Sequence, residues 1–242
     1  MSELVGYNPD KEQKQKLVTL TKIASAQTEN PNVVIYIPPI KGALPLDTTL
    51  DQFTAYGNDV WTVSIHQYGQ SLSEYVASLQ GEIKEKLADA NTYVIGFSTG
   101  CALAADTGIA IGLPREHILL VAPSYPPRTI LKIRAQAMAK RVKNAVGEKT
   151  TQPQSDDKLG LMRYIKRNLH LLIGKPLYAN WRNLNQMGLV TKRQLETATV
   201  LTGEKDDVIS PRTSHTDIFV PQAGHNFDQM APSVIQHISG KG

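Results

Sequence analysis

The sequence contains very little cysteine and no long apolar run, and both absences narrow the class of protein. Cys101 is the single cysteine among 242 residues, which excludes an internal disulfide and a zinc site with several cysteine ligands. We expect it to be a small buried filler. No apolar stretch approaches the roughly 18 residues of a membrane-spanning helix. The segment MSELVGYNPDKEQKQK is polar and lacks a secretory signal, so we expect a cytoplasmic protein without a transmembrane segment.

The balance of residue types is that of a folded globular chain. Hydrophobic residues make up 41% and charged residues 20% of the sequence, which argues against a disordered or fibrous protein. A chain of this length can bury one substantial core. We therefore expect one domain with a sizeable insertion.

The charge is unevenly distributed, although the formal net charge is only +4. Residues 126–193 contain 15 Lys and Arg residues but only three acidic residues. The rest of the chain contains 11 Lys and Arg residues and 19 acidic residues. Either these cations form a solvated outer face, or they receive an anionic surface or a phosphate-bearing substrate. No known nucleic-acid-binding motif accompanies them, so we expect no nucleic-acid partner.

Six short apolar runs predict buried strands, because they are rich in β-branched residues and bounded by turn residues. The runs are VVIYI (33–37), VWTVSI (60–65), TYVIGF (92–97), HILLVAP (117–123), TATVLTG (197–203) and TDIFVPQ (216–222). They are apolar throughout instead of alternating with polar residues, which is typical of a parallel sheet covered on both faces.

Helices are predicted between several of these strands. Apolar residues at three-and-four spacing indicate a helix over 71–90, with Ser71 or Ser73 as its cap. Small residues indicate another over 101–112, and a similar spacing favours a helix over 11–27, where VTLTKI would also tolerate a strand.

Strands that alternate with helices predict an α/β protein with a doubly wound, mostly parallel sheet. The core is expected over 1–125 and 194–242. The basic segment 126–193 interrupts the alternation and reads as helices, so we expect it to be a helical lid. An insertion after a strand's carboxyl end would cover the edge where open α/β sheets bind ligands.

The strand at 92–97 runs directly into the motif Gly96-Phe97-Ser98-Thr99-Gly100. Side chains at the two glycine positions would collide in a tight strand-to-helix turn, and the turn would expose the serine above the sheet. The following helix would favour a negative oxygen at its amino end. Ser98 is therefore a candidate nucleophile.

This strand, turn and helix resemble the nucleophile elbow of the α/β-hydrolase fold, whose members place the nucleophile, acid and histidine in that order along the chain. TGEKDDVISP follows the strand at 197–203 and resembles the family pattern, which puts the acid at Asp206, with Asp207 as the near alternative. AGHNF follows the last strand and puts the base at His225, with His215 as the rival histidine.

The resemblance also implies an oxyanion hole. Its first donor would be the main-chain N–H of Thr99, and its second would come from YIPPIKGA, at Ile40. This loop departs from the family, because Pro38 and Pro39 stand where His-Gly is common and proline has no N–H.

These residues imply a serine hydrolase that forms an acyl-enzyme from a small carboxylic ester or thioester, with no metal or organic cofactor. The alternative is a catalytically weak or inactive binding protein that keeps the fold, which the irregular Pro-Pro loop makes plausible. Ser98→Ala compared with the unmodified protein in covalent probe labelling would discriminate between the two.

Overall fold

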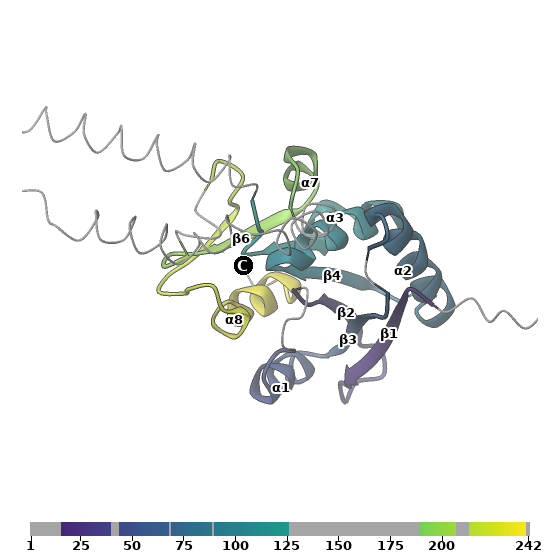
Figure 1. Ribbon diagram of the computed structural model, residues 1–242. Coiled ribbons are helices and arrows are strands. Elements are labelled where there is room, and N and C mark those ends of the chain that lie inside the picture. Colours follow the sequence, from purple (N-terminus) through teal and green to yellow (C-terminus); the bar gives the residue numbers. More distant parts are fainter. Residues whose placement is uncertain are drawn as a thin grey trace, which may run out of the picture.

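The computed structural model describes residues 16–39, 44–67, 69–88, 90–125, 189–206 and 213–240, in which strands and helices alternate (Figure 1). The strands are β1 (Val18–Ala24), β2 (Asn32–Ile37), β3 (Asn58–Ile65), β4 (Thr92–Phe97), β5 (Ile118–Val121), β6 (Thr199–Gly203) and β7 (Ile218–Val220). The α-helices are α1 (Asp47–Ala55), α2 (Leu72–Lys86), α3 (Cys101–Ala110), α7 (Lys192–Glu196) and α8 (Phe227–Ile238). Short 3₁₀ turns, η2 and η3, span Ser98–Gly100 and Arg115–His117.

The strands form one seven-stranded sheet in the order β1-β3-β2-β4-β5-β6-β7. All neighbours pair in parallel except β1, which runs antiparallel to β3 at one edge. The predicted mostly parallel α/β sheet is confirmed, and all six predicted strands are present to within a few residues.

Strand β2 shows why these runs are apolar throughout. Ile35 belongs to the core cluster on one face of the sheet, which includes Tyr75 of α2. Its neighbour Tyr36 belongs to the cluster on the other face, with Phe53 of α1 and Phe227 of α8. Successive strand residues point to opposite faces, and helices cover both, so every residue of β2 after Asn32 is buried.

The helix predicted over 11–27 is wrong in its described part, because Val18–Ala24 is strand β1. Val18 and Leu20 are both buried, at the two-residue spacing of a strand. Residues 18–24 pair with β3, whose outer edge would otherwise leave main-chain groups without partners. The alternative interpretation of VTLTKI as a strand is therefore confirmed.

The predicted cap of α2 is confirmed at Ser71. Its hydroxyl oxygen accepts a hydrogen bond from the main-chain N–H of Glu74, and the Glu74 carboxylate accepts one from the Ser71 N–H at 2.8 Å. This reciprocal pair satisfies two N–H groups that a helix start leaves without partners.

Glu82 on α2 holds the edge strand against the helix. Its carboxylate accepts a hydrogen bond from the main-chain N–H of Leu20 at 3.0 Å and forms ion pairs with Lys16 and Lys86. Burial alone would raise the pKa of this carboxyl, but the hydrogen bonds from Lys16, Lys86 and Leu20 lower the pKa to about 2. The fold therefore favours the charged form of Glu82.

We expect Glu82→Gln to lower the free energy of unfolding at neutral pH by about 2 kcal/mol, because both lysines and the Leu20 N–H lose a charged partner. The folded pKa of about 2 lies below the ordinary 4.5, so the stabilisation is complete above 4.5 and is lost as the pH falls toward 2. Urea unfolding at neutral pH and near pH 3.5 should show a smaller difference between the two proteins at the lower pH.

The matched control is Glu85→Gln, which removes an exposed carboxylate that also pairs with Lys16. This variant should leave the free energy of unfolding nearly unchanged, because exposed ion pairs contribute little. An equal loss of stability in both variants would contradict the role assigned to Glu82.

Candidate active site

Ser98 occupies the turn between β4 and α3 in a strained conformation. Its φ of 53° lies in the left-handed region that residues with a side chain rarely adopt. A Cβ atom at Gly100 would lie 2.4 Å from the main-chain oxygen of Ile37, and one at Gly96 would lie 2.6 Å from the Cα of Cys101. The predicted collision at both glycine positions is confirmed.

We expect Gly100→Ala to destabilise the protein by about 2 kcal/mol or more, because a backbone oxygen of β2 fills the space of the added methyl group. The free energy of unfolding in urea measures this effect. The matched control is Gly81→Ala inside α2, where a Cβ would meet no atom within 4 Å. This control should raise stability by about 0.5–1 kcal/mol, since alanine favours a helix more than glycine does. Stability of Gly100→Ala equal to that of the unmodified protein would contradict the packing argument.

Three polar side chains meet above the carboxyl ends of β4, β6 and β7. The Oδ2 atom of Asp206 lies 2.6 Å from Nδ1 of His225, and Nε2 of His225 lies 3.0 Å from Oγ of Ser98. Asp206 and Ser98 are 2% and 7% exposed, so water does not compete strongly for either group. A carboxylate facing Nδ1 assigns the ring proton to that nitrogen, which leaves Nε2 to accept the hydroxyl proton of Ser98.

Main-chain contacts bring the acid and the histidine together. The loops after β6 and β7 touch where the Lys205 N–H donates to the carbonyl oxygen of Ala223 at 2.8 Å. A Cβ at Gly203 would lie 2.4 Å from that same oxygen, so the approach requires glycine at the end of β6. Asp206 and His225 follow these contact points within a few residues, and backbone packing thereby sets their separation.

Further contacts hold the histidine in place. The ring of Phe97 packs against that of His225 with 5.1 Å between centroids. Asn226 caps α8 by accepting the main-chain N–H of Asp228, whose carboxylate accepts the Thr49 hydroxyl of α1 at 2.7 Å. None of these contacts was predicted from the sequence, although Asn226 just before an apolar helix and Asp228 in its first turn are a recognisable capping signal.

The structure describes only some of the other predicted site residues. Thr99 lies within the 3₁₀ turn that starts at Ser98. Ile40 and Asp207 lie outside the described residues, so the second oxyanion donor and the alternative acid stay predictions. The histidine that is hydrogen-bonded to Ser98 is His225 and not the alternative base His215.

Most of the predicted lid, 126–188, also lies outside the described residues, and its helical nature stays a prediction. The end of the predicted segment, 189–193, lies against the core. Val190 is 3% exposed, and α7 begins at Lys192. Gln194 of α7 donates a hydrogen bond to Asp106 of α3 at 2.8 Å. The chain thus re-enters the core before β6.

Cys101 is the buried filler that the sequence predicts. Its side chain is fully buried, and its Sγ donates to the main-chain oxygen of Gly96 at 3.1 Å. Burial raises the pKa of the thiol well above its ordinary value, which disfavours a nucleophilic thiolate beside Ser98. Among the described residues, no group of three His, Cys, Asp or Glu side chains is arranged to hold a metal ion, and no helix is long and apolar enough to cross a membrane.

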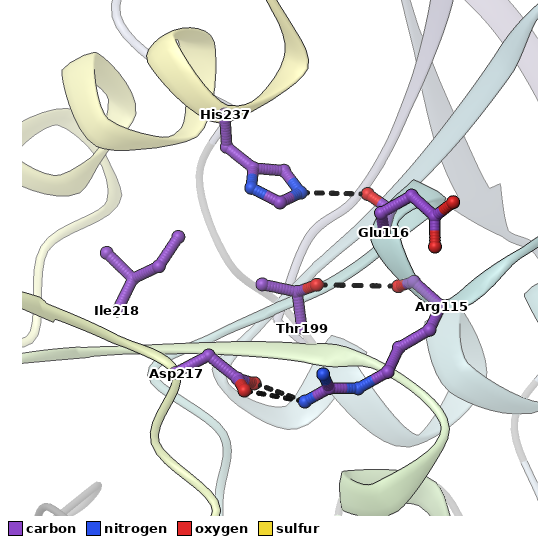
Figure 2. Close-up of a pocket in the computed structure, with 6 residues that line it drawn as sticks. All are labelled: Arg115, Glu116, Thr199, Asp217, Ile218 and His237. Carbon is purple, nitrogen blue, oxygen red and sulfur yellow. Dashed lines mark hydrogen bonds and ion pairs between the residues drawn. The ribbon is translucent and has the colours of Figure 1, made fainter. Parts of the chain in front are cut away.

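A separate cavity of about 290 Å³ lies at the opposite end of the strands. It is lined by Arg115, Glu116, Thr199, Asp217, Ile218 and His237 (Figure 2). Thr199 and Ile218 are the first residues of β6 and β7, whereas ligand sites of open parallel sheets lie at the carboxyl ends. Arg115 forms an ion pair with Asp217 at 2.6 Å, and Nε2 of His237 is hydrogen-bonded to the main-chain oxygen of Glu116 at 2.9 Å. These contacts join the amino ends of the strands and do not belong to the Ser98 site.

Comparison of the sequence with known proteins gives no relative: no protein-family model matches it, and no curated protein is similar to it. Comparison of the structure with solved structures does give matches. A marine microorganism esterase is 15% identical, with 91% of this chain and 98% of that chain covered and a TM-score of 0.52. A carboxylesterase of the thaumarchaeon Nitrososphaera gargenis is 11% identical, with 93% of each chain covered and a TM-score of 0.52.

A third match is BpoC of Mycobacterium tuberculosis H37Rv, assigned as a non-heme bromoperoxidase. It is 14% identical, with 93% of this chain and 96% of that chain covered and a TM-score of 0.50. All three share the α/β-hydrolase fold. Sequence identities this low support a conclusion about the fold alone. The chain has the α/β-hydrolase fold, as the motif around Ser98 predicts.

Proposed function

We propose that the protein is a serine hydrolase that cleaves a carboxylic ester or thioester through Ser98, His225 and Asp206. The proposal is carried by one observation: two hydrogen bonds of 2.6 and 3.0 Å link these side chains in the order acid, base, hydroxyl. A serine hydroxyl alone is a poor nucleophile and needs a base in reach that a third group orients. Both requirements are met at Ser98.

The reaction follows from the direction of these bonds. His225 takes the proton of Ser98 at Nε2 while Oγ attacks the carbonyl carbon, and Asp206 stabilises the resulting imidazolium. His225 then passes the proton to the departing alcohol or thiol, which leaves an acyl-enzyme. Water, activated by the same imidazole, releases the acid and restores Ser98.

The oxyanion of the tetrahedral intermediate needs hydrogen-bond donors beside Ser98. We assign the first to the main-chain N–H of Thr99, at the amino end of α3, where the helix dipole also favours negative charge. The loop after β2 would supply the second donor, near Ile40. Pro38 and Pro39 contribute none, because proline lacks the N–H.

The ester or thioester class fits the chemistry of an activated serine and of two of the solved structures with this fold, which are an esterase and a carboxylesterase. The fold itself does not select among acyl substrates. A binding protein with little turnover is the competing function, and covalent labelling separates the two.

We expect a fluorophosphonate probe to label the folded protein at one residue, Ser98. Ser98→Ala should abolish labelling, because the atom that forms the phosphorus–oxygen bond is removed. His225→Gln should slow it by about 10³-fold or more, since no base takes the proton. The rate of adduct formation by intact-protein mass spectrometry measures both effects.

The matched control for the histidine is His237→Gln, which changes an imidazole bonded at the opposite end of the sheet. This control should label at the rate of the unmodified protein. No labelling of the folded unmodified protein would defeat the hydrolase proposal and favour the binding protein.

We further propose that the basic segment 126–193 favours substrates that carry phosphate, because it holds 15 Lys and Arg against three acidic residues. An acyl-coenzyme A should then be hydrolysed with a lower KM than the same acyl group on N-acetylcysteamine, which lacks phosphate. Added salt should raise the first KM and leave the second nearly unchanged, since screening weakens charge attraction. Equal KM values at low salt would contradict this preference.

A further inference from the structure

Ser124 lies three residues after the end of β5, the strand that neighbours β4 on the side away from β2. It is 9% exposed, and its Oγ lies 3.3 Å from Oγ of Ser98. Its main-chain N–H also points to the main-chain oxygen of Ser98, at 3.4 Å. Two separate contacts therefore join this serine to the nucleophile.

The backbone around Ser124 is held in an unusual shape. Ala122 has a φ of 49°, a left-handed conformation that costs energy for alanine. Its N–H donates to the oxygen of Leu201 in β6 at 2.9 Å, and the Ser124 oxygen accepts the N–H of Val190 at 3.1 Å. Main-chain bonds on both sides thus fix Ser124 beside Ser98.

The proton in the contact between the two hydroxyls belongs to Ser124. Nδ1 of His225 donates to Asp206, so Nε2 has only a lone pair to offer, and the single proton of Ser98 goes to it. Ser98 has no second proton. The hydroxyl of Ser124 must therefore donate, and Oγ of Ser98 must accept.

We propose that Ser124 is a further catalytic residue, whose hydroxyl stabilises the negative charge that develops on Oγ of Ser98. The inference rests on the proposed hydrolase function. Charge grows on this oxygen when His225 removes its proton, before the bond to the carbonyl carbon is complete. It grows again when the acyl-enzyme breaks, because the electron pair of the breaking C–O bond returns to Oγ. A hydrogen bond to a charged oxygen is stronger than one to a neutral oxygen.

The contact with Ser124 also leaves one lone pair of Ser98 Oγ for the attack. The sheet order places Ser124 on the β5 side of Ser98, and the loop that begins at Pro38 on the β2 side. The hydrogen bond from Ser124 occupies one lone pair of Oγ. The other stays open for the carbonyl carbon.

The test uses the fluorophosphonate reaction, because its rate reports the reactivity of Ser98 without knowledge of the natural substrate. Ser124→Ala removes the hydroxyl and keeps the main-chain N–H. We expect its second-order rate constant of labelling to fall about tenfold or more, the effect of one hydrogen bond to a charged atom. Ser124→Thr keeps a hydroxyl and should label within about threefold of the unmodified protein.

Two further variants separate catalysis from folding. Ser239→Ala makes the same chemical change at a buried hydroxyl that has no hydrogen-bond partner in the described part of the chain, and it should label at the unmodified rate. Ser124→Cys keeps the shape of the side chain, slightly enlarged, with a weaker donor. The cysteine variant should label slowly. It replaces Ser124→Ala in the comparison if the alanine variant melts at a much lower temperature than the unmodified protein.

Each outcome decides the inference. Slow labelling by the alanine and cysteine variants, with recovery in the threonine variant, supports it. Labelling of Ser124→Ala at the rate of the unmodified protein overturns the role of Ser124 and leaves the hydrolase proposal intact. Equally slow labelling of all three Ser124 variants has the same consequence, because it indicates that Ser124 acts through packing. Failure of the unmodified protein to label overturns both proposals, since Ser98 then has no reaction to assist.

Discussion

The close approach of the turn after β4 to the end of β2 is the constraint on which the site depends. The backbones are so near that a methyl group does not fit at Gly100, and the start of α3 leaves no room for one at Gly96. This packing forces Ser98 into a left-handed conformation, with its side chain at the carboxyl edge of the sheet. The strain at one residue is small beside the burial of β2, β4 and α3 around it, so the fold can sustain it.

The parallel sheet then determines what Ser98 meets. Parallel strands all end at the same edge, so loops far apart in sequence become neighbours there. The loops after β6 and β7 touch through Lys205 and Ala223 and bring Asp206 to His225. At the other edge, the polar groups around Arg115 and Asp217 satisfy one another. The two ends of one sheet therefore differ, because the proposed reaction takes place at one end and polar contacts close the fold at the other.

Ser98 is consequently held by two partners that come from different loops at the carboxyl edge of the sheet. Its proton faces His225, and its oxygen faces the hydroxyl of Ser124, in the loop after the neighbouring strand β5. Ser124 is buried and the side chain of His225 is 23% exposed, and such burial strengthens hydrogen bonds relative to those in water. The proposed reactivity of this serine is a property of the assembled strand ends, because neither partner lies near it in sequence.

The sequence by itself determined the α/β class, the six parallel strands and the turn at Ser98, because apolar runs and tight turns are local patterns. Its resemblance to the α/β-hydrolase fold supplied the candidates Asp206 and His225. It misassigned residues 18–24, since a short amphipathic pattern suits a helix and an edge strand equally until β3 is there to pair with. Only the tertiary structure decided the hydrogen bonds that join the three residues, the support from Phe97 and Asp228, and the contact of Ser124 with Ser98. These depend on the backbone conformation at single residues such as Ala122 and on the packing of distant loops, which no local pattern specifies.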